Sequence, residues 1–344
     1  MIAPTLARLL DPKPLKPAEA RAVFEALLAP STRDAERTAV LMALAARKVT
    51  ASELAGFAFE MRRRALRFPL PSGDRPVDLC GSGGAPRPSF NVSTVSAFVV
   101  AGAGAPVVKH GNRSARGLCG SSDLLEALGL PVTTRQAFSR ESYRRFHLAF
   151  LHAPLFHPAT RAVAEARKLV GIPTLFNQLG PLSNPARVPY QVVGVPNEEA
   201  AERVAGALKI LGVRRGLAVT SREGCDEFSP RETSTAVVWS PRHHRRWQLQ
   251  PQEYLPSEDR RGSWNSLAPT DAAEEAERIL AGGGGARRGS VLLTAGAALW
   301  VAGHATSFGA GVVQAREALD DGRAERMLGQ LRDLAPHFPA PQEG

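Results

Sequence analysis

Cysteine is scarce in this chain of 344 residues, which has three, at positions 80, 119 and 225. An odd number without Cys-x-x-Cys spacing argues against a disulfide framework and against a cysteine zinc site. We therefore expect a reducing compartment, the cytoplasm, and packing roles for the three thiols.

Long apolar runs are also missing. The longest one, Ala97 to Val108, is broken by glycines and a proline and is too short to span a bilayer. No basic segment followed by an apolar stretch and small residues opens the chain. We expect no membrane partner.

Negative charge is in short supply, since 43 Lys and Arg outnumber 33 Asp and Glu and leave a net charge of +10. The excess is scattered in short groups such as Arg62–Arg64 and Arg242–Arg246, without a long basic tail or an aromatic-interleaved stripe. A generally basic surface is therefore favoured, and nucleic-acid contact stays open as a less favoured alternative.

The apolar fraction of 44% is enough for a large core. Residues 16 to 68 show helical periodicity with capping signals, and strand-like and helical segments then alternate, which predicts a largely parallel sheet. The predicted fold class is α/β: a small, mostly helical domain plus a larger α/β domain with a central, largely parallel sheet flanked by helices.

The predicted domain limits follow these composition changes. Residues 1–72 form the helical domain, which a returning segment rich in proline and glycine, about 168–189, rejoins. Residues 73–167 and 190–335 form the α/β domain, and 336–344 form a flexible tail. Residues 240 to 266 show little sequence signal for either a helix or a strand.

A glycine turn follows the first extended segment. In Gly81-Ser-Gly-Gly84 the missing Cβ atoms let backbone N–H groups approach an anion closely. Asn91, Ser93 and Thr94 then open a predicted helix, so their side chains and free amides lie at its positive end. Both features are typical of a phosphate site.

A second polar segment, Lys109-His-Gly-Asn-Arg113, leaves a predicted strand at its carboxyl end. Ligands of open α/β sheets bind at such ends, and here two fixed cations meet an amide. A solvated basic turn is the alternative for this cluster by itself, but the two loops together favour an anion site.

Further motifs follow along the chain: Phe156–Ala159, Ala166–Arg167, Phe176–Asn177, Leu179–Leu182, Asn184–Ala186 and Gly224–Glu227. With the two loops they resemble the anthranilate phosphoribosyltransferases of tryptophan biosynthesis over nearly the whole chain. The resemblance implies transfer of the 5-phosphoribosyl group from phosphoribosyl pyrophosphate to the amine of anthranilate, with Mg²⁺ as cofactor. It also implies a homodimer formed through the helical domain and a cleft between the domains.

The same resemblance implies site residues. For phosphoribosyl pyrophosphate they are Gly81, Gly83, Gly84, Asn91, Ser93, Thr94, Lys109 and Arg116. For anthranilate they are Gly81, Asn112, His157, Arg167, Gly180 and Pro181, with Arg167 suited to bind the carboxylate in a bidentate manner. For the metal they are Ser93, Asp226 and Glu227. No general acid or base is assigned, and His157 as a packed loop histidine stays an equal alternative.

The sequence departs from the family pattern near the pyrophosphate. Ser82 replaces a threonine, Ala85 replaces the acidic residue that closes the glycine loop, and Pro173 replaces an arginine. Arg116 and Gly117 replace two serines. Because Arg87 and Arg116 add guanidinium groups there, we expect more reliance on arginine and less on a second metal.

Other functions stay open at this stage. Pyrimidine nucleoside phosphorylases share the fold and a related lysine turn, and the departures leave room for a different acceptor. A non-catalytic relative that binds nucleic acid through the basic surface is the third alternative.

The expected arginine dependence can be tested by titrating activity against Mg²⁺ in the wild type and in Arg116→Ala. The variant should need more Mg²⁺ and bind the pyrophosphate group more weakly, because a cation has been removed. An unchanged metal requirement with unchanged pyrophosphate affinity would contradict this expectation.

Overall fold

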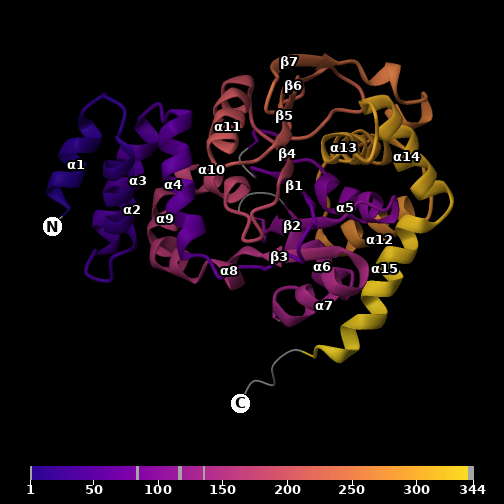
Figure 1. Cartoon of the computed structure of the whole chain (residues 1–344), viewed down its shortest axis with the longest axis horizontal. Coiled ribbons are helices and arrows are strands. Elements are labelled where there is room, and N and C mark those ends of the chain that lie inside the picture. Colours follow the sequence, from indigo (N-terminus) through magenta and orange to yellow (C-terminus); the bar gives the residue numbers. More distant parts are fainter. Residues whose placement is uncertain (1, 83–84, 115–117, 135, 340–344) are drawn as a thin grey trace.

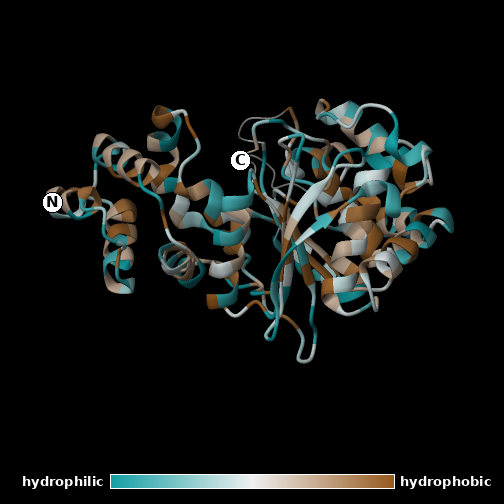
Figure 2. Cartoon of the chain, turned by 90° about the horizontal axis from the view of Figure 1, so that it is seen from above, coloured by the Kyte–Doolittle hydropathy of each residue, from teal (hydrophilic) through white to brown (hydrophobic). Residues whose placement is uncertain are grey.

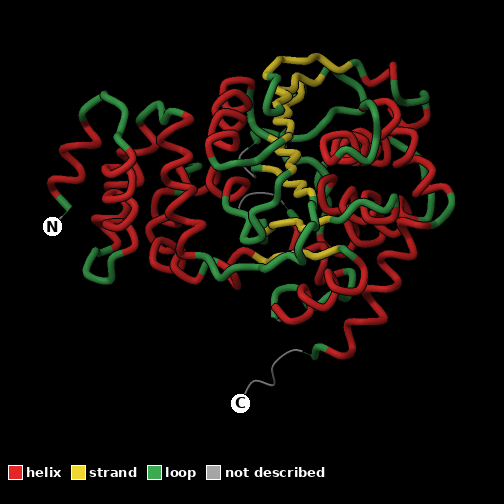
Figure 3. The backbone as a smooth tube through the Cα atoms, viewed as in Figure 1, coloured by secondary structure: helices red, strands yellow, loops and turns green. Residues whose placement is uncertain are grey.

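The computed structural model describes residues 2–82, 85–114, 118–134 and 136–339, and it has two lobes joined side by side (Figure 1). One lobe is entirely helical, and all strands lie in the other (Figure 3). Within the described residues, no helix has the length and apolar character needed to cross a membrane.

The helical lobe begins with α1 (Ala3–Leu10), α2 (Pro17–Leu28), α3 (Asp34–Ala46) and α4 (Ala51–Arg64). The predicted signals at Pro17 and Thr50 mark the starts of α2 and α4, whereas the predicted Ser31–Asp34 signal is wrong, because Arg33 stands at the N-cap of α3 without a side-chain cap. The Thr50 hydroxyl accepts the Glu53 amide, and the Glu53 carboxylate accepts the Thr50 amide, which together start α4. Glu53 is also buried and pairs with Arg47 at 2.9 Å, which holds the loop before α4.

The returning segment brings two more helices to this lobe, α9 (Ala164–Val170) and α10 (Leu175–Leu182). The α10 helix was not predicted, because proline and glycine dominate its surroundings. Its interior Pro181 is tolerated near the C-terminal end of the helix, where the last turn ends at Ser183.

The α/β lobe holds a seven-stranded sheet in the order β3-β2-β1-β4-β5-β6-β7. Its strands are β1 (Val77–Gly81), β2 (Val107–Gly111), β3 (Leu148–His152), β4 (Tyr190–Gly194), β5 (Arg215–Ser221), β6 (Ser234–Trp239) and β7 (His244–Leu249). The first five are parallel, and β6 and β7 run antiparallel. The predicted fold class is confirmed.

Helices cover both faces of this sheet. They are α5 (Val92–Gly102), α6 (Ser121–Ala127), α7 (Gln136–Phe146), α8 (Ala153–Phe156), α11 (Glu198–Ile210), α12 (Pro269–Leu280), α13 (Ala286–Ala302), α14 (Phe308–Asp320) and α15 (Arg323–Leu334). Short 3₁₀ turns link several of these elements: η1 (Pro158–Val163), η2 (Pro251–Glu253), η3 (Glu258–Arg260) and η4 (Ala335–His337). Helices of both lobes alternate between hydrophobic and hydrophilic stretches, as amphipathic helices do (Figure 2).

Two large hydrophobic cores lie on the two faces of the sheet, and one of them extends into the helical lobe. Side chains on one face of the sheet pack with α5 and α12 to α15, whereas the other face packs on α11, which in turn contacts the helical lobe. Val192 belongs to the first core and Val193 to the second, as strand alternation requires. The lobes are therefore fixed to each other by apolar packing as well as by their connecting segments.

Some elements lacked a sequence signal. The edge strand β7 lies in the segment that carried little signal, because five of its six residues are charged or polar or half-exposed, and pairing with β6 alone makes it a strand. The α7, β3, α11 and α15 segments were likewise not predicted. The domain limits stay a prediction. The predicted tail overlaps η4, and residues 340–344 lie outside the described residues.

Candidate functional site

A cavity of about 430 Å³ lies at the carboxyl ends of β1 and β2, between the lobes. Met61 and Phe176 line it from the helical lobe, while Lys109 and Asp226 line it from the α/β lobe. This is the cleft that the parallel order of β1 and β2 predicts, because both strands end at the same edge.

The N-terminus of α5 and a buried lysine form one end of the cleft. Lys109 is 2% exposed, and its Nζ donates to the Leu79 carbonyl at 2.6 Å and to the Ser93 hydroxyl at 3.1 Å. Asn91 donates its Nδ2 to the Cys119 carbonyl at 3.1 Å, and its Oδ1 is buried without a partner among the described residues. A cation and a helix N-terminus thus meet where an anion can bind.

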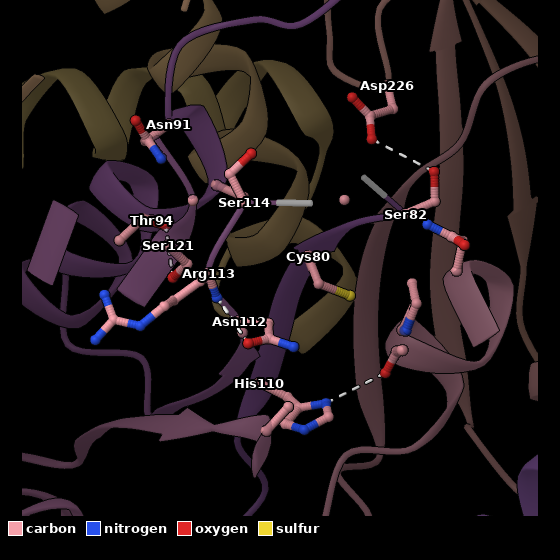
Figure 4. A pocket seen from close by; sticks show the side chains of 18 of the residues that line it. Cys80, Ser82, Asn91, Thr94, His110, Asn112, Arg113, Ser114, Ser121 and Asp226 are labelled. Carbon is pink, nitrogen blue, oxygen red and sulfur yellow. Dashed lines mark hydrogen bonds between the residues drawn. The ribbon is translucent and has the colours of Figure 1, made fainter. Parts of the chain in front are cut away.

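Two adjacent carboxylates close the same end. Asp226 and Glu227 are both buried, and Ser82 faces Asp226 with its hydroxyl 3.4 Å from Oδ2 (Figure 4). Burial, and then the neighbouring Asp226, raise the pKa of Glu227 to about 8, while Lys109 and hydrogen bonds from Ser93 lower it. A pKa of about 8 means that the carboxyl group of Glu227 favours its protonated form at neutral pH, and a bound cation would favour the ionised form instead.

This carboxylate pair fits a divalent cation of the magnesium type. Within the described residues there is no group of three or more His, Cys, Asp or Glu side chains that could hold a metal alone. Mg²⁺ commonly binds one or two carboxylates and takes its other ligands from phosphates and water. The Asp226–Glu227 pair beside the Ser93 hydroxyl matches that donor set.

Two glycines allow the carboxylate loop to reach the sheet. A Cβ on Gly194 would lie 1.6 Å from the Asp226 carbonyl oxygen, and one on Gly81 would lie 2.9 Å from Asp226 Oδ2. A third glycine, Gly120, would place its Cβ 2.2 Å from the Ser114 amide nitrogen. Only glycine permits the backbone approaches at Gly194 and Gly120, whereas the contact at Gly81 is with a side chain.

A half-buried guanidinium lines the cleft from α9 of the helical lobe. Arg167 lies over the Phe176 ring, with its Cζ 5.6 Å from the ring centroid. Within the described part of the chain it forms no ion pair, and burial lowers its pKa. A guanidinium in this state favours a carboxylate ligand from outside the protein.

Two neutral histidines lie near this guanidinium. The rings of His110 and His157 are 5.1 Å apart, and Nδ1 of His110 is 3.2 Å from the Gly180 carbonyl (Figure 4). Burial lowers the pKa of His157 to about 4 and the pKa of His110 well below its usual range. Each Nε2 is buried without a partner among the described residues.

Most of the predicted site residues lie around this one cleft. The structure places there Gly81, Asn91, Ser93, Thr94, Lys109, Asn112, His157, Arg167, Gly180, Pro181, Asp226 and Glu227. His157 is both packed and cleft-lining, so its two alternatives are compatible. Gly83, Gly84, Arg116 and Gly117 lie outside the described residues, so their roles stay predictions.

One expectation is wrong. Arg87 does not line the cleft, because its guanidinium lies 3.5 Å from Glu223 and donates to Asn265 at 3.0 Å. Arg113 is also held away from an anion role, since it pairs with Asp123 and Glu126.

Other cleft residues were missed. They are Met61, Cys80, His110, Cys119, Ser121, Thr160, Phe176 and Asn177 among others. His110 stands inside the Lys109–Arg113 motif and could have been proposed from it. Met61 had no signal, because its helix reaches the cleft only through packing between the lobes.

Known proteins resemble the whole chain. The family model described as "Glycosyl transferase family, a/b domain" matches residues 73–325, and the model for the family's helical bundle domain matches residues 3–65. Anthranilate phosphoribosyltransferase from Desulfosudis oleivorans is 39% identical over 332 residues, which cover 96% of this chain and 98% of that protein.

Solved structures agree with these matches. Anthranilate phosphoribosyltransferase from Thermus thermophilus is 34% identical with a TM-score of 0.87, over 96% of this chain and 99% of that one. The enzyme from Saccharomyces cerevisiae, in complex with phosphoribosyl pyrophosphate and Mg, is 25% identical with a TM-score of 0.85, over 98% of both chains.

We expect Gly194→Ala to lower the free energy of unfolding by at least about 2 kcal/mol, because the new Cβ overlaps the Asp226 carbonyl and overpacks the loop. Urea unfolding measures this. Gly329→Ala is the matched control, since its Cβ would meet no atom within 4 Å and it lies within α15. Equal stability of the two variants would contradict the prediction.

The histidine pKa predicts acid sensitivity. Below pH 6.5 the unfolded chain protonates His157, whereas the folded chain keeps it neutral down to about pH 4, so stability falls as the pH falls through this window. From pH 7 to pH 4.5 this one group should lower the free energy of unfolding by about 2 kcal/mol. Urea unfolding of the wild type and of His157→Gln at both pH values checks it.

The wild type must be compared with His157→Gln because Asp78 changes the free energy of unfolding in the opposite direction as the pH falls. Burial raises the pKa of Asp78 to about 6, so its contribution favours the folded state at low pH. An equal pH dependence in wild type and His157→Gln would show that His157 does not carry the effect.

Proposed function

The chain belongs to the anthranilate phosphoribosyltransferase family, and from this premise we propose how its cleft binds the two substrates. Its activity is transfer of the 5-phosphoribosyl group from phosphoribosyl pyrophosphate to the amine of anthranilate, with release of pyrophosphate, in tryptophan biosynthesis. The observation that carries the proposal is the half-buried guanidinium of Arg167, which has no ion pair among the described residues. It shares one cleft with Lys109 and the carboxylate pair but comes from α9, in the helical lobe.

Phosphoribosyl pyrophosphate binds at the α5 end. Lys109 neutralises phosphate charge, while Asn91, Ser93 and Thr94 offer hydrogen bonds at the start of the helix. The buried Oδ1 of Asn91, which no described residue contacts by a hydrogen bond, supports this assignment, since it can accept a hydroxyl of the ribose. Gly81, Gly83, Gly84 and Arg116 belong to the same proposal from the sequence.

Asp226 and Glu227, with Ser93, would hold Mg²⁺ beside the pyrophosphate. The bound ion would neutralise the charge that develops on the leaving pyrophosphate. The burial of both carboxyl groups supports this proposal, because a bound cation would stabilise the ionised forms that burial disfavours. The yeast relative was solved with phosphoribosyl pyrophosphate and Mg, which agrees with it.

Anthranilate binds at the Arg167 end. The guanidinium pairs with its carboxylate, and the Phe176 ring holds the guanidinium in place from behind. Asn112 orients the amine or the carboxylate by hydrogen bonds. Gly180, Pro181 and His157 complete the wall against the aromatic ring.

Displacement at the anomeric carbon follows from this arrangement. The bond from that carbon to pyrophosphate breaks through a cationic state, and the lone pair of the amine forms the new C–N bond. The neutral amine attacks and then loses its proton to solvent, so no strong general base is required. His110 and His157 stay uncharged and do not add positive charge beside the cationic carbon.

A homodimer formed through the helical lobe and a cytoplasmic location, both expected from the sequence, stay part of the proposal. Their support is the family membership alone.

Loss of anthranilate fluorescence in the presence of phosphoribosyl pyrophosphate and Mg²⁺ tests the activity. No loss with wild type at micromolar concentration would contradict the proposed substrates. In the same assay, Arg167→Lys should raise the KM for anthranilate about tenfold or more, because a bidentate charged hydrogen bond is lost. The KM for phosphoribosyl pyrophosphate should change by less than about twofold, because the residues assigned to that substrate are unchanged in this variant.

Arg161→Lys is the matched control for this variant. Arg161 precedes α9 on η1, is exposed, and does not line the cleft. Both KM values should stay at the wild-type level. An Arg167→Lys variant with an unchanged KM for anthranilate would remove Arg167 from the acceptor site.

A further inference from the structure

The two strands that carry the phosphate loops separate as they approach the cleft. β1 pairs with β4 along its whole length, from Val77 opposite Tyr190 to Gly81 opposite Gly194. With β2, the recorded pair is Val77 opposite Val107 alone, among residues that are all described. Backbone groups of β2 beyond this pair therefore need other partners.

Two buried polar side chains fill the gap, and we call them the polar plug: Asp78 of β1 and Asn184 of the loop after α10. Asp78 Oδ1 accepts the His110 amide at 3.1 Å. Asn184 Nδ2 donates to the Val108 carbonyl at 2.8 Å and to Asp78 Oδ2 at 2.9 Å. Both side chains are 0% exposed. The plug thus replaces the missing ladder between β1 and β2.

The plug is also connected to the acceptor end of the cleft. Gln191 of β4 donates its Nε2 to Asp78 Oδ2 at 3.3 Å and to the carbonyl of Pro181. The neighbouring Gly180 carbonyl contacts His110, whose amide binds the plug. Gly180 and Pro181, which we assign to anthranilate, are therefore linked by hydrogen bonds to the Asp78 carboxylate. The same carboxylate binds β2, the strand that carries Lys109.

Electrostatics support this connection. Burial raises the pKa of Asp78 to about 6, and the charge of Lys109 is the strongest influence that lowers it. At neutral pH the carboxylate is therefore ionised and offsets part of the charge of Lys109 inside the sheet.

Burying a carboxylate in this gap carries a desolvation cost. An apolar pair of similar size would carry no desolvation cost, but it would leave the His110 amide and the Val108 carbonyl without partners. It would also remove the contact to Gln191. The polar plug keeps the strands apart while giving the His110 amide and the Val108 carbonyl hydrogen-bond partners.

We propose that Asp78 is a positioning residue, which through Asn184, Gln191 and His110 sets the distance between the phosphate end and the acceptor end of the cleft. Asp78 itself does not line the cleft, so it acts through these neighbours. The inference rests on the proposed function, because it assigns a role in aligning those two substrates.

Asp78→Asn tests it with little change in volume. The new amide can still accept from His110, but its NH₂ group faces the NH₂ groups of Asn184 and Gln191, so the plug must rearrange. We expect the KM values for phosphoribosyl pyrophosphate and for anthranilate both to rise by about tenfold or more, together with a fall in kcat, because misplacement by a fraction of an ångström affects both ends.

Asp259→Asn is the control variant, because it also replaces a buried carboxylate by an amide. Asp259 is also 0% exposed and pairs with Arg288 at 2.5 Å, but it does not line the cleft or contact the plug. This variant should lower the thermal midpoint while leaving both KM values within about twofold of wild type, since the sites are far apart. The same result for Asp78→Asn would overturn the proposal.

If Asp78→Asn does not fold, Asn184→Ala removes the other half of the plug and must raise both KM values. Unchanged KM values in a folded Asn184→Ala variant would also overturn the inference. An inactive wild type would instead overturn the proposed function. In that event, calorimetric titration of phosphoribosyl pyrophosphate into wild type and Asp78→Asn still tests the phosphate half, where a weaker affinity of the variant is expected and an equal affinity contradicts the positioning role.

Discussion

Burial of charge at the carboxyl edge of the sheet is the constraint on which the rest of this structure depends. Lys109, Asp226 and Glu227 are almost fully buried, and so is Asp78 beneath them. Charges removed from water must be paired or hydrogen-bonded, or they must be neutralised. The close approach of backbone at Gly194, the separation of β1 from β2 and the start of α5 all serve this requirement.

Incomplete compensation of these charges is what makes the site able to bind. Burial and the neighbouring Asp226 disfavour the ionised form of Glu227, which a bound cation would stabilise, and Arg167 has no ion pair within the described residues. A cation, a phosphate and a carboxylate are therefore the groups that the cleft favours. The protein arranges this before the substrates arrive, so little reorganisation is needed when they bind.

The helical lobe is part of the site because it shares a core with the sheet. Phe24 of α2 lies against Phe176, with ring centroids 6.0 Å apart, and Phe176 supports the guanidinium of Arg167. Meanwhile α11 contacts both the sheet and α4. Apolar packing thus fixes the acceptor end of the cleft relative to the sheet and to the phosphate end.

The sequence by itself determined the elements whose signals are local. Thr50 and Glu53 cap α4, the Gly81 turn and the Lys109–Arg113 segment lie at strand ends, and the motif series identified the family and twelve of the residues that line the cleft. Tertiary structure alone decided the rest. β7 is a strand only because β6 pairs with it, Met61 reaches the cleft only through the shared core, and Arg87 is drawn to Glu223. The plug of Asp78 and Asn184 joins residues more than a hundred positions apart, so no local pattern could show that they meet in one gap.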